Sequence, residues 1–238
     1  LDLTRNGMAV HRVQPAKAAN YARSLRSHCK TDAADARALA RYGAERHEQL
    51  PLFLPPDAVQ QELQDLYSRR QDLVEMRKSE KQRRKHPRYA GTQDSLQRML
   101  DALDVEIRHI EDRINTLILD NHQLQEKKKV MTVLKGVGET TAMCLLARMP
   151  ELGQLTRRQV AALAGVAPHP NDSGRRSGRR CIRGGREDVR SALYMAAISA
   201  ITHNPRFKAI YQNMIQQGKE PLVAMNAVMR KMIVIINA

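Results

Sequence analysis

One repeat of apolar residues constrains the fold of this chain more than any other feature of its sequence. From Thr92 onward, apolar residues recur at alternating spacings of four and three over four heptads. The positions are Leu96, Leu100, Leu103, Ile107, Ile110, Ile114, Leu117, Asn121 and Leu124. Such a repeat is typical of helices that pack as a coiled coil. We therefore predict a long helix with Asn121 on its seam, where a buried amide can fix the register.

A second helical pattern precedes this repeat and supplies a partner for it. It begins at Asp57, after a linker bracketed by Pro51 and Pro56, and becomes very basic over residues 77–88. Its apolar positions are Val59, Leu63, Leu66 and Leu73. Residues 86–91 break the helix, so we predict an antiparallel helical hairpin. The spacing leaves open whether the seam pairs within the hairpin or with another chain, and whether the basic run is a solvated tip or a nucleic-acid contact.

Charge limits the partners of the chain. Its 40 basic and 25 acidic residues give a net charge of +15, which favours nucleic acid or an anionic membrane surface as the partner. No apolar run reaches the ~18 residues that a membrane helix needs, so we expect no segment that spans a bilayer. Of the two partners that the charge favours, we expect nucleic acid and no membrane. Cys29, Cys144 and Cys181 lack the spacing of a zinc site or a disulfide framework. We expect a cytoplasmic protein that is associated with the nucleoid when it is bound to DNA.

Two carboxylates near the N-terminus are candidate metal ligands. The pattern predicts a short strand at residues 8–13, a helix at residues 16–25, and a second helix capped by Thr31. A spacing of three places Asp32 and Asp35 on one face of that second helix. Paired carboxylates can hold a divalent cation such as Mg²⁺. Alternatively, both are acids in a first helical turn, where the helix dipole favours negative charge.

The C-terminal half has a helical pattern with a candidate phosphate-binding turn. Gly136 and Gly138 flank an apolar residue between two helices, which resembles a helix-hairpin-helix motif whose backbone amides face a phosphate. The alternative is a tight turn between helices. Thr156 and Gln159 have the form of a capping box, and Gly165 ends the helix that it opens. Further helices are predicted at about residues 187–203, 206–217 and 221–238.

An arginine-rich segment at residues 166–190 contains two Ser-Gly pairs among seven arginines, and it is too rich in Gly and Pro to be helical. A hydroxyl on a flexible turn among cations is a plausible nucleophile for a phosphodiester, and the two candidates are Ser173 and Ser177. The same run could instead only grip a nucleic-acid backbone, since arginine donates to phosphate in either case. The predicted contacts are Arg175, Arg176, Arg179, Arg180 and Arg183.

These motifs together resemble one family over nearly the whole chain. Residues 30–40, with the sequence Lys-Thr-Asp-Ala-Ala-Asp-Ala-Arg-Ala-Leu-Ala, and the Asp-Ser-Gly motif at residues 172–174 carry the resemblance, with Leu-Tyr-Met at 193–195 and Asn-Pro at 204–205 in support. The chain is similar to the DEDD-type insertion-sequence transposases of the IS110 family, closest to its IS1111 branch, a group that includes the Piv DNA invertase.

The resemblance implies a mainly α chain in three parts. Residues 1–50 would be a C-terminal fragment of an RuvC-like α/β domain with the RNase H fold. Residues 51–128 would form the coiled-coil hairpin, and residues 129–238 a compact helical transposase domain with the helix-hairpin-helix motif and the serine loop. The resemblance makes Asp32 and Asp35 ligands of Mg²⁺ and Ser173 the nucleophile, with Ser177 as its competitor.

The resemblance also implies a function. The chain would be a DNA transposase or site-specific recombinase that acts through a covalent serine-DNA intermediate. An element-encoded guide RNA would direct it. It would act as a homo-oligomer, a dimer or tetramer, in which the metal-binding domain and the serine come from different subunits. The family's first aspartate and its glutamate lie before residues 8–13 and are missing here, and both ends look cut, so we expect this fragment to be inactive alone. The alternative is a non-catalytic nucleic-acid-binding coiled-coil protein or the remnant of a decayed transposon.

Overall fold

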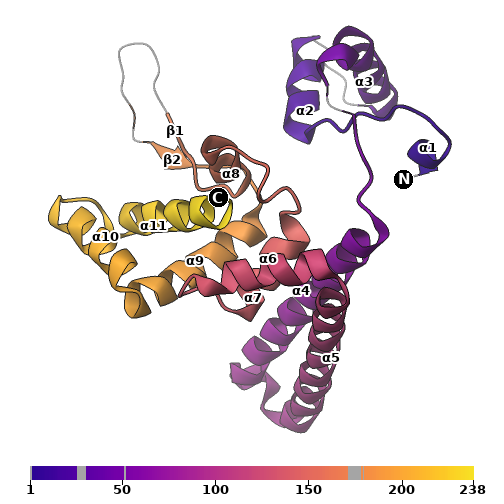
Figure 1. Cartoon of the computed structure of the whole chain (residues 1–238). Helices are drawn as coiled ribbons and strands as arrows, with labels where there is room; N and C mark the ends of the chain where they lie inside the picture. The colour runs from indigo at the N-terminus through magenta and orange to yellow at the C-terminus, as the bar shows by residue number, and fades with distance from the viewer. Residues whose placement is uncertain (1, 26–30, 51, 171–177, 179) are drawn as a thin grey trace. The chain divides into compact units, whose positions relative to one another are not determined.

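The computed structural model describes residues 2–25, 31–50, 52–170, 178 and 180–238 (Figure 1). The chain divides into two compact units, Leu1–Asp57 and Ala58–Ala238. Helices dominate both units, and the described residues contain one sheet, of two short strands. The predicted mainly α class is therefore confirmed. None of the helices in the described part of the chain is both long and apolar enough to cross a membrane.

The N-terminal unit contains few helices and a small core. Its elements are α1 (Asp2–Arg5), α2 (Pro15–Ser24), α3 (Asp32–Arg46) and the 3₁₀ turn η1 (His47–Gln49). The Tyr21 hydroxyl donates a hydrogen bond of 2.7 Å to Glu45, which ties α2 to α3. The rings of Tyr21 and Tyr42 meet edge to face at 5.0 Å. Ala38 is the one buried hydrophobic residue among the described residues of this unit.

The strand predicted at residues 8–13 forms only a single bridge. His11 pairs with Leu52 in an isolated antiparallel bridge, and the Phe53 amide donates to the Val10 carbonyl at 2.7 Å. A strand gains its hydrogen bonds from neighbouring strands, and no other segment described in this unit pairs with these residues. The prediction of a strand was therefore wrong in extent, and the RuvC-like domain stays a prediction that rests on the resemblance.

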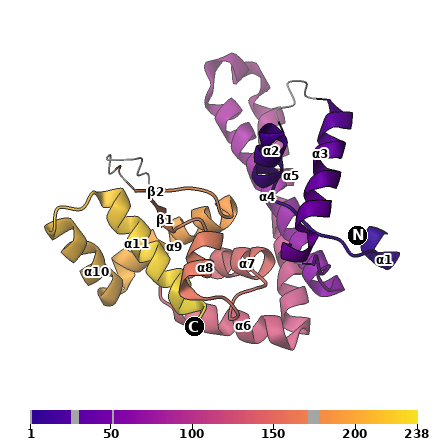
Figure 2. The same cartoon turned by 90° about the horizontal axis from the view of Figure 1, so that it is seen from above.

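The C-terminal unit begins with an antiparallel helical hairpin. Helix α4 (Ala58–Lys85) is joined through the 3₁₀ turn η2 (Pro87–Thr92) to α5 (Gln93–Asp120), and the two helices lie side by side (Figures 1 and 2). Three ion pairs join the two helices. Their residue numbers on α5 fall as those on α4 rise, as an antiparallel arrangement requires. The pairs are Glu62–Arg113 (2.9 Å), Arg70–Glu111 (2.6 Å) and Arg77–Asp104 (2.8 Å).

The predicted seam is buried in most of its positions. All six of its apolar residues from Leu96 to Ile114 are buried, and those from Leu103 onward share a core cluster with Leu63 and Leu73 of α4. This part of the seam therefore packs within the chain. At its end the seam passes through Ile118, which is fully buried, and Leu117 is only partly buried.

Asn121 does not occupy the seam. Helix α5 ends at Asp120, and Asn121 is the N-cap of α6 (His122–Val133), where its Oδ1 accepts a hydrogen bond of 3.1 Å from the Leu124 amide. An asparagine side chain satisfies a free amide at a helix start, and this local contact replaces the predicted role in register. The prediction for Asn121 was therefore wrong.

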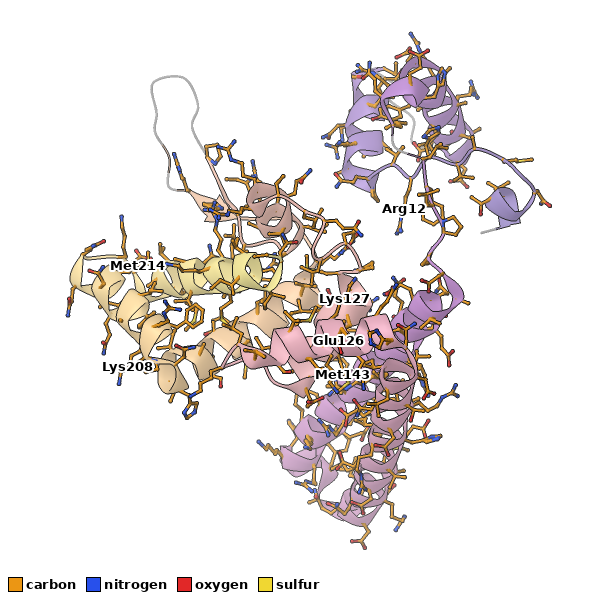
Figure 3. All side chains as sticks on the ribbon, viewed as in Figure 1. Arg12, Glu126, Lys127, Met143, Lys208 and Met214 are labelled. Atoms are coloured by element: carbon orange, nitrogen blue, oxygen red, sulfur yellow. The ribbon has the colours of Figure 1, made fainter. Side chains whose placement is uncertain are left out.

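The remaining helices pack around α9 and against the hairpin. They are α7 (Glu139–Arg148), α8 (Arg157–Leu163), α9 (Glu187–His203), α10 (Pro205–Gln216) and α11 (Pro221–Ile236). Helix α7 is buried from Thr141 to Ala147 between α4, α6 and α9. Its Met143 belongs to a core cluster that includes residues of the hairpin and of α9 (Figure 3). One core therefore serves the hairpin and the C-terminal helices.

Candidate nucleic-acid interface and catalytic segment

Asp32 and Asp35 lie in the first turn of α3 and are exposed. The Thr31 hydroxyl accepts a 3.2 Å hydrogen bond from the Ala34 amide, which fixes the start of this helix as predicted. In the part of the chain that the structure describes, no three His, Cys, Asp or Glu side chains are grouped so that they could hold a metal ion. Two carboxylates are the type of ligand that Mg²⁺ takes beside substrate phosphates. The donors present fit Mg²⁺ in kind, but they do not form a complete protein site.

The arginine-rich segment at residues 166–190, here named the serine segment, is described at residues 166–170, 178 and 180–190. Ser173, Ser177, Arg175, Arg176 and Arg179 lie outside the described residues. The strands β1 (Pro168–His169) and β2 (Cys181–Ile182) precede and follow these residues in the chain, and they pair antiparallel. This pairing was not predicted from the sequence, because strands of two residues carry no periodic signal. The chain just before and just after these residues therefore lies side by side.

The chain just after β2 packs closely against the end of α8. Gly165 and Gly185 both have a positive φ, of 69° and 70°. A Cβ on Gly185 would lie 2.3 Å from the Gly165 nitrogen and 2.4 Å from its Cα, so no larger residue fits. The Arg186 amide donates to the Leu163 carbonyl at 2.8 Å. These contacts fix one end of the serine segment to the C-terminal end of α8.

Two arginines of the segment hold this end in place. Arg186 donates two hydrogen bonds to the Glu151 carboxylate, of 2.7 and 2.9 Å, and a third to the Arg148 carbonyl. The hydrogen bonds from Arg186 lower the pKa of Glu151. Arg190 donates to the Gly184 carbonyl at 2.8 Å. Bidentate arginine-carboxylate pairs are geometrically specific, so Arg186 anchors this end of the segment to Glu151, and Arg190 adds a single hydrogen bond to the turn after β2.

Arg148 connects the same region to the hairpin. Its Nε lies 2.6 Å from an Asp188 oxygen at the start of α9, and its Nη2 donates to the Ser68 hydroxyl of α4 at 3.1 Å. Its guanidinium carbon also lies 5.2 Å from the centre of the Tyr67 ring. Burial is the main cause that raises the pKa of Tyr67 and that raises the pKa of the neighbouring Cys144 to about 11. The sequence analysis missed this cluster because its members lie far apart in the chain.

Arg180 and Arg183 differ from Arg186 and Arg190. Both are exposed, and neither has a hydrogen-bond or ion-pair partner within the described ranges. They stand on either side of β2, within the serine segment. Their guanidiniums are therefore available to an external anion such as a phosphate.

The predicted helix-hairpin-helix glycines have separate environments. Gly136 has a φ of 112°, and a Cβ there would lie 2.6 Å from the Ala200 Cβ and 2.8 Å from the Ala196 carbonyl oxygen of α9. Helix packing therefore explains Gly136. Gly138 is the exposed N-cap of α7, and no side chain caps that helix. Lys128 forms an ion pair with Glu139 beside it. Phosphate binding by this turn stays a prediction.

Two family models match the chain. One, described as "Transposase IS116/IS110/IS902 family", matches residues 128–212, and a second, the IS110-type DEDD model described as "Transposase", matches residues 2–86. The first range contains the serine segment with Arg180 and Arg183, and the second contains Asp32 and Asp35.

Named relatives point the same way. The pilin gene-inverting proteins of Moraxella bovis and Moraxella lacunata are each 29% identical over 222 residues, which is 90% of this chain and 67% of theirs. "Insertion element IS110 uncharacterized 43.6 kDa protein" of Streptomyces coelicolor is 30% identical over 146 residues, which is 60% of this chain and 35% of that protein. The chain thus spans about two thirds of the Moraxella proteins and about a third of the Streptomyces protein. With a transposase model on each of its two halves and these relatives, the chain belongs to the IS110 family of transposases.

Proposed function

We propose that this chain is part of a DNA recombinase that cuts and rejoins DNA through a covalent serine-DNA intermediate. The observation that carries the proposal is that the two transposase models match the two segments that bear the predicted chemistry, the Asp32–Asp35 pair and the serine segment. Family membership implies DNA as the partner, and the pilin gene-inverting relatives are named for a DNA rearrangement.

The nucleophile in this proposal is Ser173. Its oxygen attacks the phosphorus of one DNA linkage, a new phosphorus-oxygen bond forms, and the bond to the leaving strand end breaks. The serine proton ends on the oxygen of that released end, so the number of phosphoester bonds is unchanged. A hydroxyl of another strand end then reverses the step and frees the serine. Strands are thereby exchanged without an external source of energy.

The arginines of the serine segment have two different roles in this proposal. Arg186 and Arg190 hold one end of the serine segment, as their bonds to Glu151 and the Gly184 carbonyl support. Arg180 and Arg183, exposed and unpaired in the described part of the chain, would contact the DNA phosphates with the predicted partners Arg175, Arg176 and Arg179. Donors placed around a reacting phosphate stabilise the charge of its transition state.

Asp32 and Asp35 would hold a divalent cation, which we propose is Mg²⁺. When it is bound, the cation neutralises charge on the reacting phosphate and polarises its oxygens. The exposure of both carboxylates supports this role, because a ligand pair that meets a substrate phosphate must be accessible. The remaining ligands would come from other parts of the complete protein or from the DNA.

The resemblance adds two partners to the proposal. One is a structured RNA, encoded beside the recombinase, that pairs with donor and target DNA. The other is further copies of the protein, so that the metal-binding residues of one subunit serve the serine of another. The net charge of +15 supports a polyanionic partner of either kind.

The test is an assay for a protein-DNA adduct. The protein of the complete reading frame would be incubated with labelled DNA, the neighbouring non-coding RNA and Mg²⁺, and run on denaturing gels. We expect an adduct that is lost in Ser173→Ala and kept in Ser177→Ala, a control in the same segment. Asp32→Ala should also abolish strand exchange and leave nucleic-acid binding intact. Salt-sensitive binding without any adduct would favour the alternative, a non-catalytic nucleic-acid-binding protein.

A further inference from the structure

A basic groove runs along one side of the distal half of α4, away from both catalytic segments in sequence. It encloses about 390 Å³ and is lined by Val74, Arg77, Lys78, Lys81, Gln82 and Lys85. Arg77, Lys81 and Lys85 follow one another at intervals of four residues, so they rise along the same side of the helix in steps of about 6 Å. The groove is therefore a linear row of cations.

Two of these cations are not neutralised by the protein. Lys81 and Lys85 are exposed, and neither forms an ion pair with a carboxylate among the residues the structure describes. Arg77 pairs with Asp104 of α5, and Lys78 pairs with Glu75 through an exposed contact of 3.2 Å. The hydrogen bond from Arg77, with added charge from Lys81, lowers the pKa of Asp104, so that carboxylate stays ionised and already has its partner. The surplus charge lies at Lys81 and Lys85.

The lining residues indicate the kind of ligand. No acidic and no aromatic side chain lines the groove. Proteins that bind single strands combine cations with aromatic rings on which bases stack, so a single-stranded ligand fits poorly. A straight row of cations without rings instead matches an extended polyanion that offers phosphates at regular intervals. A base-specific contact is not needed for such binding.

We infer that this groove, here named the α4 groove, binds the phosphate backbone of duplex DNA through Lys81 and Lys85. The choice of DNA rests on the proposed function, since a transposase must hold DNA beside its reacting strands. The hairpin would then position the duplex by charge, and the serine segment would act on it. Such a contact adds affinity and carries no sequence preference.

The experiment measures binding of the chain to labelled duplex DNA by fluorescence anisotropy over a range of salt concentrations. The test variant is Lys81→Gln/Lys85→Gln. Salt weakens the binding, so a plot of log affinity against log salt has a negative slope. Each lost phosphate contact should make this slope about 0.9 less negative, so the loss of two contacts makes it about 1.8 less negative and weakens binding roughly 60-fold at about 0.1 M salt. The variant Lys81→Arg/Lys85→Arg keeps the charge and should keep the slope.

The matched control is Arg69→Gln/Arg98→Gln, which removes the same charge from exposed positions of the hairpin outside the groove. Arg69 lies about a third of a turn around α4 from Lys81, so this control should leave the slope nearly unchanged. Circular dichroism would verify that every variant is folded.

Three results with the variants would overturn the inference. They are an unchanged slope in Lys81→Gln/Lys85→Gln, an equal loss in the control, or a loss seen with duplex RNA and not with duplex DNA. The adduct assay is separate: normal serine adducts with an unchanged slope would leave the proposed function standing and remove only the α4 groove. A wild-type chain that does not bind duplex DNA would also overturn the inference.

Discussion

Gly136 and Gly138 lie two residues apart between α6 and α7, but only Gly136 has a backbone conformation that alanine rarely adopts. At a φ of 112°, an added Cβ would press on Ala200 and on the Ala196 carbonyl oxygen. We expect Gly136→Ala to lower the free energy of unfolding by about 2–4 kcal/mol, from backbone strain and overpacking together. Urea unfolding of the chain would measure this loss.

The control for this prediction is Gly138→Ala. Gly138 has a φ of −91°, and its added Cβ would meet nothing within 4 Å. Its substitution should change stability by less than about 1 kcal/mol. Equal losses at the two positions would refute the packing role of Gly136. A loss of DNA binding in Gly138→Ala without loss of stability would in turn support the predicted phosphate contact.

The structural role of a single residue could be predicted well where one local interaction decides it. Thr31 caps α3, and the Thr156–Gln159 capping box is present, because each needs only residues three apart. The prediction for Asn121 was wrong because two local preferences competed there. Its place in the apolar repeat favoured the seam, and its side chain favoured a helix cap. The cap won, since α5 ends one residue earlier.

Among the elements, the end of the serine segment depends on the ion pair between Arg186 and Glu151. The hydrogen bonds from Arg186 lower the folded-state pKa of Glu151 below its ordinary value of 4.5. The pair therefore contributes its full stability above about pH 4.5, and this contribution is lost as the pH falls through the lowered pKa. Both side chains are about a third exposed, so the contribution is at most about 1 kcal/mol.

The measurement is the urea midpoint between about pH 6 and about pH 3, compared between the wild-type chain and Glu151→Gln. The wild type should lose more stability than the variant over the acid half of this range, because glutamine keeps the shape of the side chain but does not titrate. If the urea midpoints of the two proteins fell in parallel with pH, the ion pair between Arg186 and Glu151 would not stabilise the contact of β2 and α9 with the turn after α7.

The hairpin could be predicted from sequence, whereas the tertiary contacts around the serine segment could not. An apolar repeat over four heptads specifies a helix and its buried side, so the residues from Leu96 to Ile114 were identified correctly. The β1–β2 pairing and the Arg148 cluster join residues that no local pattern relates. The position of Ser173, predicted from a resemblance, lies outside the described residues.

At the scale of the whole molecule, the Asp32–Asp35 pair and the serine segment belong to two units with very different hydrophobic cores. Every residue of the main hydrophobic cluster lies between Val59 and Ile236, within the C-terminal unit. The N-terminal unit, which carries Asp32 and Asp35, has only Ala38 buried among its described apolar residues. Small domains bury too little surface to be stable without further contacts. We therefore expect the C-terminal unit to account for nearly all of the cooperative stability.

This expectation can be tested by limited proteolysis and by cutting the chain between the units. Leu54, close to the end of the N-terminal unit, is 81% exposed, and a protease should cleave nearby to leave a resistant fragment that begins close to Ala58. Residues 58–238 expressed alone should unfold in urea with nearly the midpoint of the full chain, whereas residues 1–57 alone should unfold without a cooperative transition. A much lower midpoint for residues 58–238 would mean that the N-terminal unit stabilises the rest. If the prediction holds, the Asp32–Asp35 segment must be held in place by contacts outside the N-terminal unit. Added DNA or a second copy of the chain should then protect this segment from the protease.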